Sequence, residues 1–312
     1  MPVINQLTSA PVGSTIPPHY THKKDQSEVL LTSWDSFRPD TFVVSARWPT
    51  QHRFYLTQNG LHDPMLFAES VRQCFPLLSH AGYGLPFGYH LIWQYLTYEV
   101  VPSAMRAGSD PTELDLYITC SDIRYRSGGQ LAALTLHVVA LRGGEHLGTA
   151  QARFSCHSPS IYQRLRGSYA DLDRSIAAAG APPPPVVPSR VARDREDNVV
   201  LAPTEHHRLW TLRNDTSHPV LFDHPLDHSP GMLVLEAARQ ATHATCGPVY
   251  PVRLESTFLQ FTELDTPCRI SAAPDPVGEL DNRQRIQILA SQGSDTTFTG
   301  VVTVLPIAPE AD

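Results

Sequence analysis

The chain has 312 residues with a formal net charge of −7 and a calculated pI near 6.1, which argues against a nucleic-acid binder because such proteins usually carry a basic stripe. Its five cysteines are scattered without a CxxC pair, a pattern typical of neither a zinc site nor a disulfide framework. The N-terminus lacks the basic and apolar regions of a secretory signal, and no apolar run approaches the roughly 18 residues of a membrane span. We therefore expect a cytoplasmic protein with no metal, no cofactor, no nucleic-acid partner and no membrane partner.

The first half of the chain predicts one helix among several strands. Residues 1–20 are polar and rich in Pro and Gly, which predicts a flexible lead-in. A helix is predicted over about 65–79, because Pro64 suits a first helical turn; Pro76 predicts a kink or an early stop. Runs of β-branched and aromatic residues, with Gly pairs between the later ones, predict strands over 29–31, 41–48, 89–101, 112–126, 131–142 and 146–156.

A connecting segment separates this half from a second one of the same order. Residues 160–179 predict a polar helix, and the run APPPPVVP over 181–188 predicts an extended linker. We predict domains over 21–158 and 190–306, joined by 159–189, with a tail over 307–312. In the second domain we expect a loop over 213–230, a helix over about 232–245, and strands over 199–201, 207–212, 252–263, 268–273, 285–291 and 296–305.

The two predicted helices carry the same polar residues at the same spacing. Glu69, Arg72 and Gln73 lie at positions i, i+3 and i+4, and so share one helix face. Glu236, Arg239 and Gln240 repeat this pattern 167 residues later (236 − 69 = 167). The repeat predicts an α+β fold in which each half wraps a curved antiparallel sheet around its central helix, since each element needs an apolar partner face.

The segments leading into the two helices differ. The second passes through His224, His228 and a Pro-Gly pair, so that the N–H groups near Gly231 and Met232 are available to an oxyanion or a phosphate. In the first half Pro64 stands near the helix start and has no N–H to offer. The two halves are therefore predicted not to be equivalent: either one site is degenerate, or one composite site draws on both helices.

These motifs resemble those of the A-factor biosynthesis family, the γ-butyrolactone autoinducer synthases with a hotdog fold. The resemblance covers roughly residues 22–305 and rests on long ordered motifs. They are His22-Lys23 with EVLLT (28–32), ARWP (46–49), HxFY (52–55), DPMLFAESVRQ (63–73) and HPLDHSPGMLVLEAARQ (224–240). It implies a tandem double hotdog fold, in which two curved sheets each wrap a central helix as a pseudo-dimer.

The resemblance also implies a reaction. A β-ketoacyl group, carried as a thioester on acyl carrier protein, is transferred to dihydroxyacetone phosphate, and the ester cyclises to a butenolide phosphate, a precursor of a signalling molecule. It points to Glu69, Glu236 and Arg239 as functional residues, and it leaves a homodimer open. We hypothesise that burial raises the pKa of Glu69 or Glu236 so that one acts as the base, and that Arg239 holds the phosphate.

We expect the other polar residues around the two helices to bind substrate. These are Arg72, Gln73, His224, His228, Gly231, Met232 and Gln240.

Simpler interpretations stand beside these. The Glu/Arg pairs could be solvated ion pairs, and the histidines and Asp227 could be turn or capping residues. For His22-Lys23-Lys24 we favour a solvated charge cluster over a phosphate or carrier contact, and for Trp93, Tyr95 and Tyr98 we favour sheet packing over an acyl tunnel.

Alternative functions on the same fold are a dehydratase or a thioesterase, and a different class is a non-catalytic acyl-ligand binder. Dependence on dihydroxyacetone phosphate separates the first two from a synthase.

Overall fold

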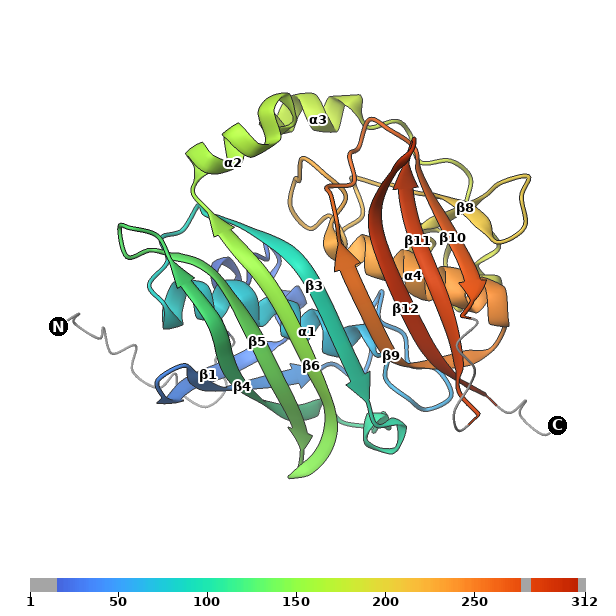
Figure 1. The fold of residues 1–312 in the computed structure, drawn as a ribbon. Helices are drawn as coiled ribbons and strands as arrows, with labels where there is room; N and C mark the ends of the chain where they lie inside the picture. The colour runs from blue at the N-terminus through green and yellow to red at the C-terminus, as the bar shows by residue number, and fades with distance from the viewer. Residues whose placement is uncertain (1–15, 276–281, 308–312) are drawn as a thin grey trace.

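The computed structural model describes residues 16–275 and 282–307 and contains one continuous antiparallel sheet of twelve strands (Figure 1). The first half contributes the helix α1 (Met65–Leu77) and six strands: β1 (Leu31–Arg38), β2 (Thr41–Trp48), β3 (His90–Val100), β4 (Thr112–Tyr125), β5 (Leu131–Arg142) and β6 (Glu145–His157). The second contributes α4 (Gly231–Cys246) and six more: β7 (Leu201–Pro203), β8 (Leu209–Leu212), β9 (Val249–Phe258), β10 (Cys268–Pro274), β11 (Gln284–Gln292) and β12 (Asp295–Pro306).

The strand order confirms the predicted internal repeat. It reads β1-β2-β4-β5-β6-β3 in the first half and β9-β12-β11-β10-β8-β7 in the second. From each outer edge inward, both halves therefore place their strands in the same order, and they meet at the β3–β9 pair. Each half wraps its sheet around one helix (Figure 1). The arrangement is the expected tandem double hotdog, in which one chain supplies both members of a pseudo-dimer.

Two short helices of the connector, α2 (Pro159–Arg166) and α3 (Leu172–Ala178), arch over one end of the molecule from β6 to the second half (Figure 1). Residues 181–187 after them have no regular structure, as the proline run predicts. The boundaries 21–158 and 190–306 remain our proposal for the two domains. None of the helices among the described residues is long and apolar enough to cross a bilayer.

Several predicted elements differ in detail. The short strand predicted over 29–31 is instead β1, which extends to Arg38, because pairing with β2 orders a polar stretch that has little strand character of its own. The α-helical part of α1 ends one residue after Pro76 and is followed by a π-helical turn, Leu78–Gly82. Of the predicted lead-in, residues 1–15 lie outside the described residues, as do 308–312 of the tail. Ile16 is buried and its N–H donates to Leu31 O, so the described end of the lead-in packs on the fold.

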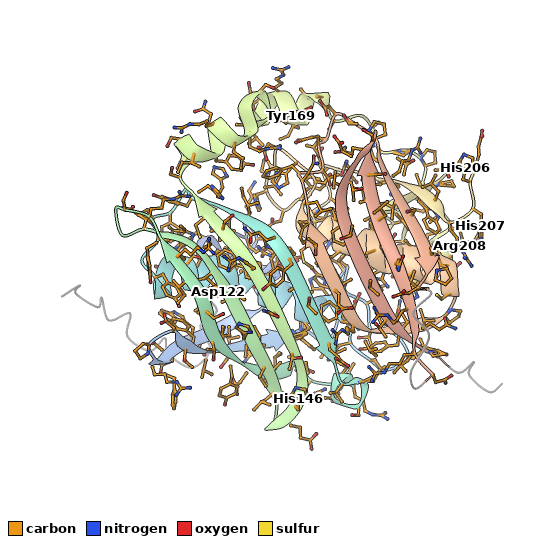
Figure 2. The ribbon with its side chains drawn as sticks, viewed as in Figure 1. Asp122, His146, Tyr169, His206, His207 and Arg208 are labelled. Carbon is orange, nitrogen blue, oxygen red and sulfur yellow. The ribbon has the colours of Figure 1, made fainter. Side chains whose placement is uncertain are left out.

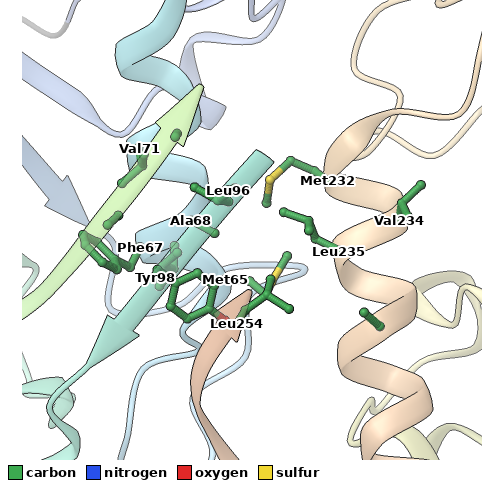
Figure 3. Close-up of a cluster of buried hydrophobic side chains, with 14 of the residues drawn as sticks. Met65, Phe67, Ala68, Val71, Leu96, Tyr98, Met232, Val234, Leu235 and Leu254 are labelled. Atoms are coloured by element: carbon green, nitrogen blue, oxygen red, sulfur yellow. The ribbon is translucent and has the colours of Figure 1, made fainter. Parts of the chain in front are cut away.

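The apolar core lies between the sheet and the two helices. Figure 3 shows Met232 and Leu235 of α4 pointing toward Met65 of α1 and Leu96 of β3, whereas Val234 points the other way. Met65, Leu96 and Leu235 are fully buried. The two helices are therefore held in one core, which fixes the start of α4 relative to the start of α1.

The strand pairing is short where the halves meet. β3 pairs with β9 only from Tyr95 to Glu99, although β3 begins at His90. At the same point the register of β3 against β6 shifts between Trp93 and Tyr95, which makes Gln94 a β-bulge. A bulge bends its strand and increases the local twist, so β3 leaves β9 at Gln94 and a gap opens beneath the arch of α2.

Candidate active site

A cavity of about 1200 Å³ occupies this gap and is lined by residues of both halves. It exceeds the roughly 300–1,000 Å³ of ordinary small-molecule pockets, so it has room for two substrates. The first half contributes residues before β1, the middle of α1 and the beginning of β3. The second contributes the loop before α4, the first residues of α4 and the chain after β9, while α2 and α3 form the roof.

One end of the cavity is built around Glu69 and two cations. Arg72 donates from Nε and Nη2 to the two oxygens of Glu69, at 2.9 and 2.8 Å, and Nζ of Lys23 lies 3.2 Å from the same carboxylate. The Lys23 side chain is only 6% exposed. The predicted solvated charge cluster is wrong for His22 and Lys23, which line the cavity, whereas Lys24 is exposed as predicted. We call Lys23, Glu69, Arg72 and Gln73 the Glu69 cluster.

The hypothesis that burial makes a glutamate basic is wrong for both helices. Burial alone would raise the pKa of Glu69, but Arg72 and Lys23 outweigh it and lower the pKa to about 2. In the same way Arg193 and Arg239 outweigh burial and lower the pKa of Glu236 to about 2. Both carboxylates are charged acceptors already engaged by donors, which makes them poor proton acceptors at neutral pH.

The corresponding cluster on α4 is sealed. Arg239 donates to both oxygens of Glu236 at 2.8 and 2.9 Å, and Arg193 Nη2 lies 2.7 Å from that carboxylate. Arg193 also donates to Phe54 O, lies over the Phe54 ring and is 3.4 Å from Asp63, with no exposed side-chain surface. We call Arg193, Glu236, Arg239 and Gln240 the Glu236 cluster. None of the four lines the cavity, so Arg239 does not lie where the predicted phosphate contact would need it.

The two glutamines tie their helices to the strands. Gln73 donates to Glu69 and to Glu28 O and accepts from the Leu30 N–H. Gln240 makes the same three bonds, to Glu236, to Asn198 O and from the Val200 N–H. Both amides are buried outside the cavity lining, which assigns them to holding the fold and corrects their predicted role in binding substrate.

The starts of the two helices differ in whether their N–H groups are satisfied. At α1 the Asp63 carboxylate accepts from the Met65 N–H and its carbonyl accepts from Leu66. At α4 the first bonded N–H belongs to Leu233, and the N–H groups of Gly231 and Met232 have no acceptor among the described residues. Both residues line the cavity. The open helix start predicted from the Pro-Gly pair is therefore on the cavity wall.

The loop before α4 also brings two histidine–carboxylate pairs into the cavity lining. Nδ1 of His224 lies 2.6 Å from Asp223, and Nδ1 of His228 lies 2.6 Å from Asp227. A charged carboxylate accepts hydrogen bonds, so Nδ1 carries the proton and Nε2 keeps its lone pair when the ring is neutral. Asp223 further accepts from the Lys24 N–H, which ties His224 to the Glu69 cluster.

The roof holds the second of these pairs. Tyr162 of α2 donates to both oxygens of Asp227 at 2.8 Å, and Arg166 donates to the same carboxylate at 3.2 Å. Arg166 also binds Glu263 at 2.8 Å, and Tyr162 stacks on His90 at 3.6 Å between ring centres. The roof is thus fastened to both halves, and Tyr169 continues it along the arch (Figure 2).

Sequence reasoning did not single out Arg193, Arg166 or Asp223. Arg193 follows Pro188 at the same spacing at which Lys23 follows Pro18, and the two prolines begin equivalent turns before β7 and β1. This shared spacing is a sequence signal that could have identified Arg193. Arg166 contacts Asp227, which lies 61 residues further along the chain, and no local pattern marks it.

His206 and His207 lie in an exposed turn at the outer edge of the second half, away from the arch (Figure 2). The described residues contain no group of His, Cys, Asp or Glu side chains suited to a metal ion.

The fold defines this protein as a double hotdog protein, and the cavity is lined by residues of both halves. A solved structure titled oleoyl thioesterase (putative) from Lactobacillus plantarum matches 86% of this chain and 96% of its own, with a TM-score of 0.53 and 10% identity, and supports the fold alone. The model of the A-factor biosynthesis hotdog domain matches residues 5–158 and 176–308, and the chain belongs to that family.

Curated relatives span nearly the whole chain. A protein of Streptomyces virginiae is 40% identical over 292 residues, covering 93% of this chain and 97% of the relative. One of Streptomyces griseus subsp. griseus is 36% identical over 308 residues, covering 97% and 95%, and one of Streptomyces coelicolor is 37% identical over 288 residues, covering 91% and 89%. All three are named 2-oxo-3-(phosphooxy)propyl 3-oxoalkanoate synthase.

Proposed function

We propose that this protein transfers a β-ketoacyl group from a thioester to the hydroxyl of dihydroxyacetone phosphate, making a 2-oxo-3-(phosphooxy)propyl 3-oxoalkanoate. The observation that carries the proposal is the shared cavity, which is lined by two cations of the first half and by an open helix start and a His–Asp pair of the second. The relatives' shared name states the same product.

The phosphate is assigned to the Glu69 cluster. Lys23 and Arg72 are the cations of α1 and its neighbouring segment that line the cavity. Nε and Nη2 of Arg72 bind Glu69, and Nη2 also donates to Thr21 O, so Nη1 is the guanidinium nitrogen assigned to the phosphate. The ammonium of Lys23 has three N–H donors. Its ion pair with Glu69 reaches one carboxylate oxygen, so the ammonium keeps donors for a phosphate. In this account Glu69 holds both cations in place and transfers no proton.

The carbonyl of the thioester is assigned to the start of α4. The N–H groups of Gly231 and Met232 supply two donors, and the helix dipole favours the negative charge that develops on the oxygen. His224 is the proposed base: its Nε2 accepts the hydroxyl proton as the alcohol oxygen attacks the carbonyl carbon. When the C–S bond breaks, the same nitrogen returns the proton to the thiolate, so that a thiol leaves and an ester remains.

This assignment gives different roles to Glu69, Glu236 and Arg239, the three functional residues that the resemblance implied. Glu69 belongs to the phosphate end, whereas Glu236 and Arg239 hold α4 against the segment before β7. We propose that the latter pair supports the reaction through the position of α4, since both are buried outside the cavity lining. We further propose that acyl carrier protein delivers the thioester.

The direct test is to mix the protein with a β-ketoacyl N-acetylcysteamine thioester and dihydroxyacetone phosphate and to look for the phosphorylated ester by mass spectrometry. The expected result is an ester whose formation requires both substrates. Release of thiol and free acid at a rate that does not depend on dihydroxyacetone phosphate would instead identify a thioesterase. Binding of the thioester without turnover would identify an acyl-ligand binder.

A further inference from the structure

Trp93 stands at the point where the sheet opens. It is the last residue of β3 before the bulge at Gln94, and with Leu91 and Ile92 it lines the cavity just beyond the β3–β9 pairing. Its ring meets Phe258 at the end of β9 edge-on, with 5.2 Å between the ring centres. The two aromatic rings, one from each half, therefore contact each other where β3 and β9 separate.

The same pair touches the proposed carbonyl site. A Cβ added to Gly231 would lie 3.1 Å from Cε3 of Trp93 and 3.5 Å from Cζ of Phe258. A Cβ at this first position of α4 would therefore press on the Trp93 ring and touch the Phe258 ring. A carbonyl bound at this helix start would consequently lie close to Trp93 and Phe258.

The end of the cavity that holds the Glu69 cluster is unsuited to an alkyl tail. Lys23, Glu69 and Arg72 occupy the polar end, where burying an alkyl chain would desolvate three charges. Beyond Trp93 the lining includes Leu91, Ile92 and Met232, so an alkyl tail turned away from the phosphate lies along apolar side chains.

We infer that Trp93 and Phe258 bound the space for the alkyl tail of the β-ketoacyl group and so set which tail lengths and branches react. This inference deepens the proposed function and rests on it. Trp93 also packs on Phe75 of α1, with 5.2 Å between the ring centres, as the prediction of packing expects, so the inference adds a second role to that packing. Tyr98, on the other side of the bulge, is buried as that prediction expects.

The test compares Trp93→Leu with Tyr95→Leu. Tyr95 is also an aromatic residue of β3, but it follows the bulge, does not line the cavity and accepts a hydrogen bond from Gln151. For each protein, kcat/KM is measured with β-ketoacyl N-acetylcysteamine thioesters that differ by one methylene or by a terminal branch. We expect Trp93→Leu to shift the ratio between longer and shorter tails by about tenfold, the usual effect of one methylene in an apolar pocket, and Tyr95→Leu to leave it unchanged.

Trp93→Phe covers the case in which the leucine variant does not fold, and it should shift the ratio in the same direction by less. An unchanged tail preference in a folded, active Trp93 variant would overturn the inference. So would a change only in the preference for carrier-bound over N-acetylcysteamine thioesters, because Trp93 would then contact the carrier arm. A wild-type protein that makes no phosphorylated ester with any tail would count against the proposed function itself.

Discussion

The Glu69 and Glu236 clusters use the same three helix residues and make the same hydrogen bonds, yet only one opens into the cavity. The difference comes from their neighbours. In the second half Arg193 fills the position of Lys23, and it reaches Glu236, Asp63 and Phe54 O at once. Asp63 meanwhile caps α1, whereas Pro230 at the same place leaves α4 open. The Glu236 cluster is thus sealed inside the second half, whereas Lys23, Glu69 and Arg72 of the Glu69 cluster line the cavity.

The sharpest way to break this comparison is to remove the matched cations with the same substitution. Arg193→Met leaves Asp63 and Glu236 buried without one of their partners, and should lower the free energy of unfolding by about 3–5 kcal/mol. Lys23→Met leaves Glu69 paired with Arg72, and should cost far less stability while raising KM for dihydroxyacetone phosphate at least tenfold. Urea denaturation and steady-state kinetics measure both. Equal losses of stability would show that the clusters are equivalent.

Acid should reveal the charge of both clusters. Each glutamate has a pKa of about 2 in the folded protein against an ordinary value of 4.5. A depressed carboxyl pKa stabilises the fold above the unfolded value, and this stability is lost as the pH falls from about 4.5 toward 2. At about 1.4 kcal/mol per pKa unit, each carboxylate contributes on the order of 3 kcal/mol. The free energy of unfolding of Glu236→Gln should fall less between pH 5 and pH 3 than that of the wild type, and an identical slope would contradict the account.

His224 has no histidine counterpart in the first half, since the position that precedes it by 167 residues is Thr57. His224→Ala should lower kcat about 100-fold. The melting temperature should change little, because the imidazole ring is partly exposed and the substitution removes no buried charge. His206→Ala, in an exposed turn, serves as the control and should be neutral. A His224→Ala variant with normal kcat would move the proton transfer to another group.

Tyr162→Phe tests the roof with the smallest expected effect. It removes one donor to the Asp227 carboxylate. Burial raises the pKa of that carboxylate, but His228, Tyr162 and Arg166 outweigh burial and lower the pKa to about 2. Loss of a hydrogen bond to a charged group should cost about 1–2 kcal/mol of stability. Because Arg166 still anchors α2, the variant should stay folded and active. A large loss would mean that the roof depends on Tyr162 rather than on the arginine.

Much of this architecture can be predicted from the sequence because it is local or repeated. The 167-residue offset between the two Glu-Arg-Gln patterns predicts two equivalent helices, and the Pro-Gly pair predicts the open start of α4. The charge state of the glutamates could not be predicted, since Lys23 and Arg193 reach them from 46 and 43 residues away. The role of Trp93 depends on a bulge and on Phe258, which lies in the other half of the molecule.

Calorimetric titration of the protein with dihydroxyacetone phosphate tests the central claim most directly. The account predicts one binding site per chain, lost in Lys23→Met and retained in Arg239→Lys, which keeps a charge in the sealed cluster. Two sites per chain, or a single site that survives Lys23→Met and disappears in Arg239→Lys, would contradict it.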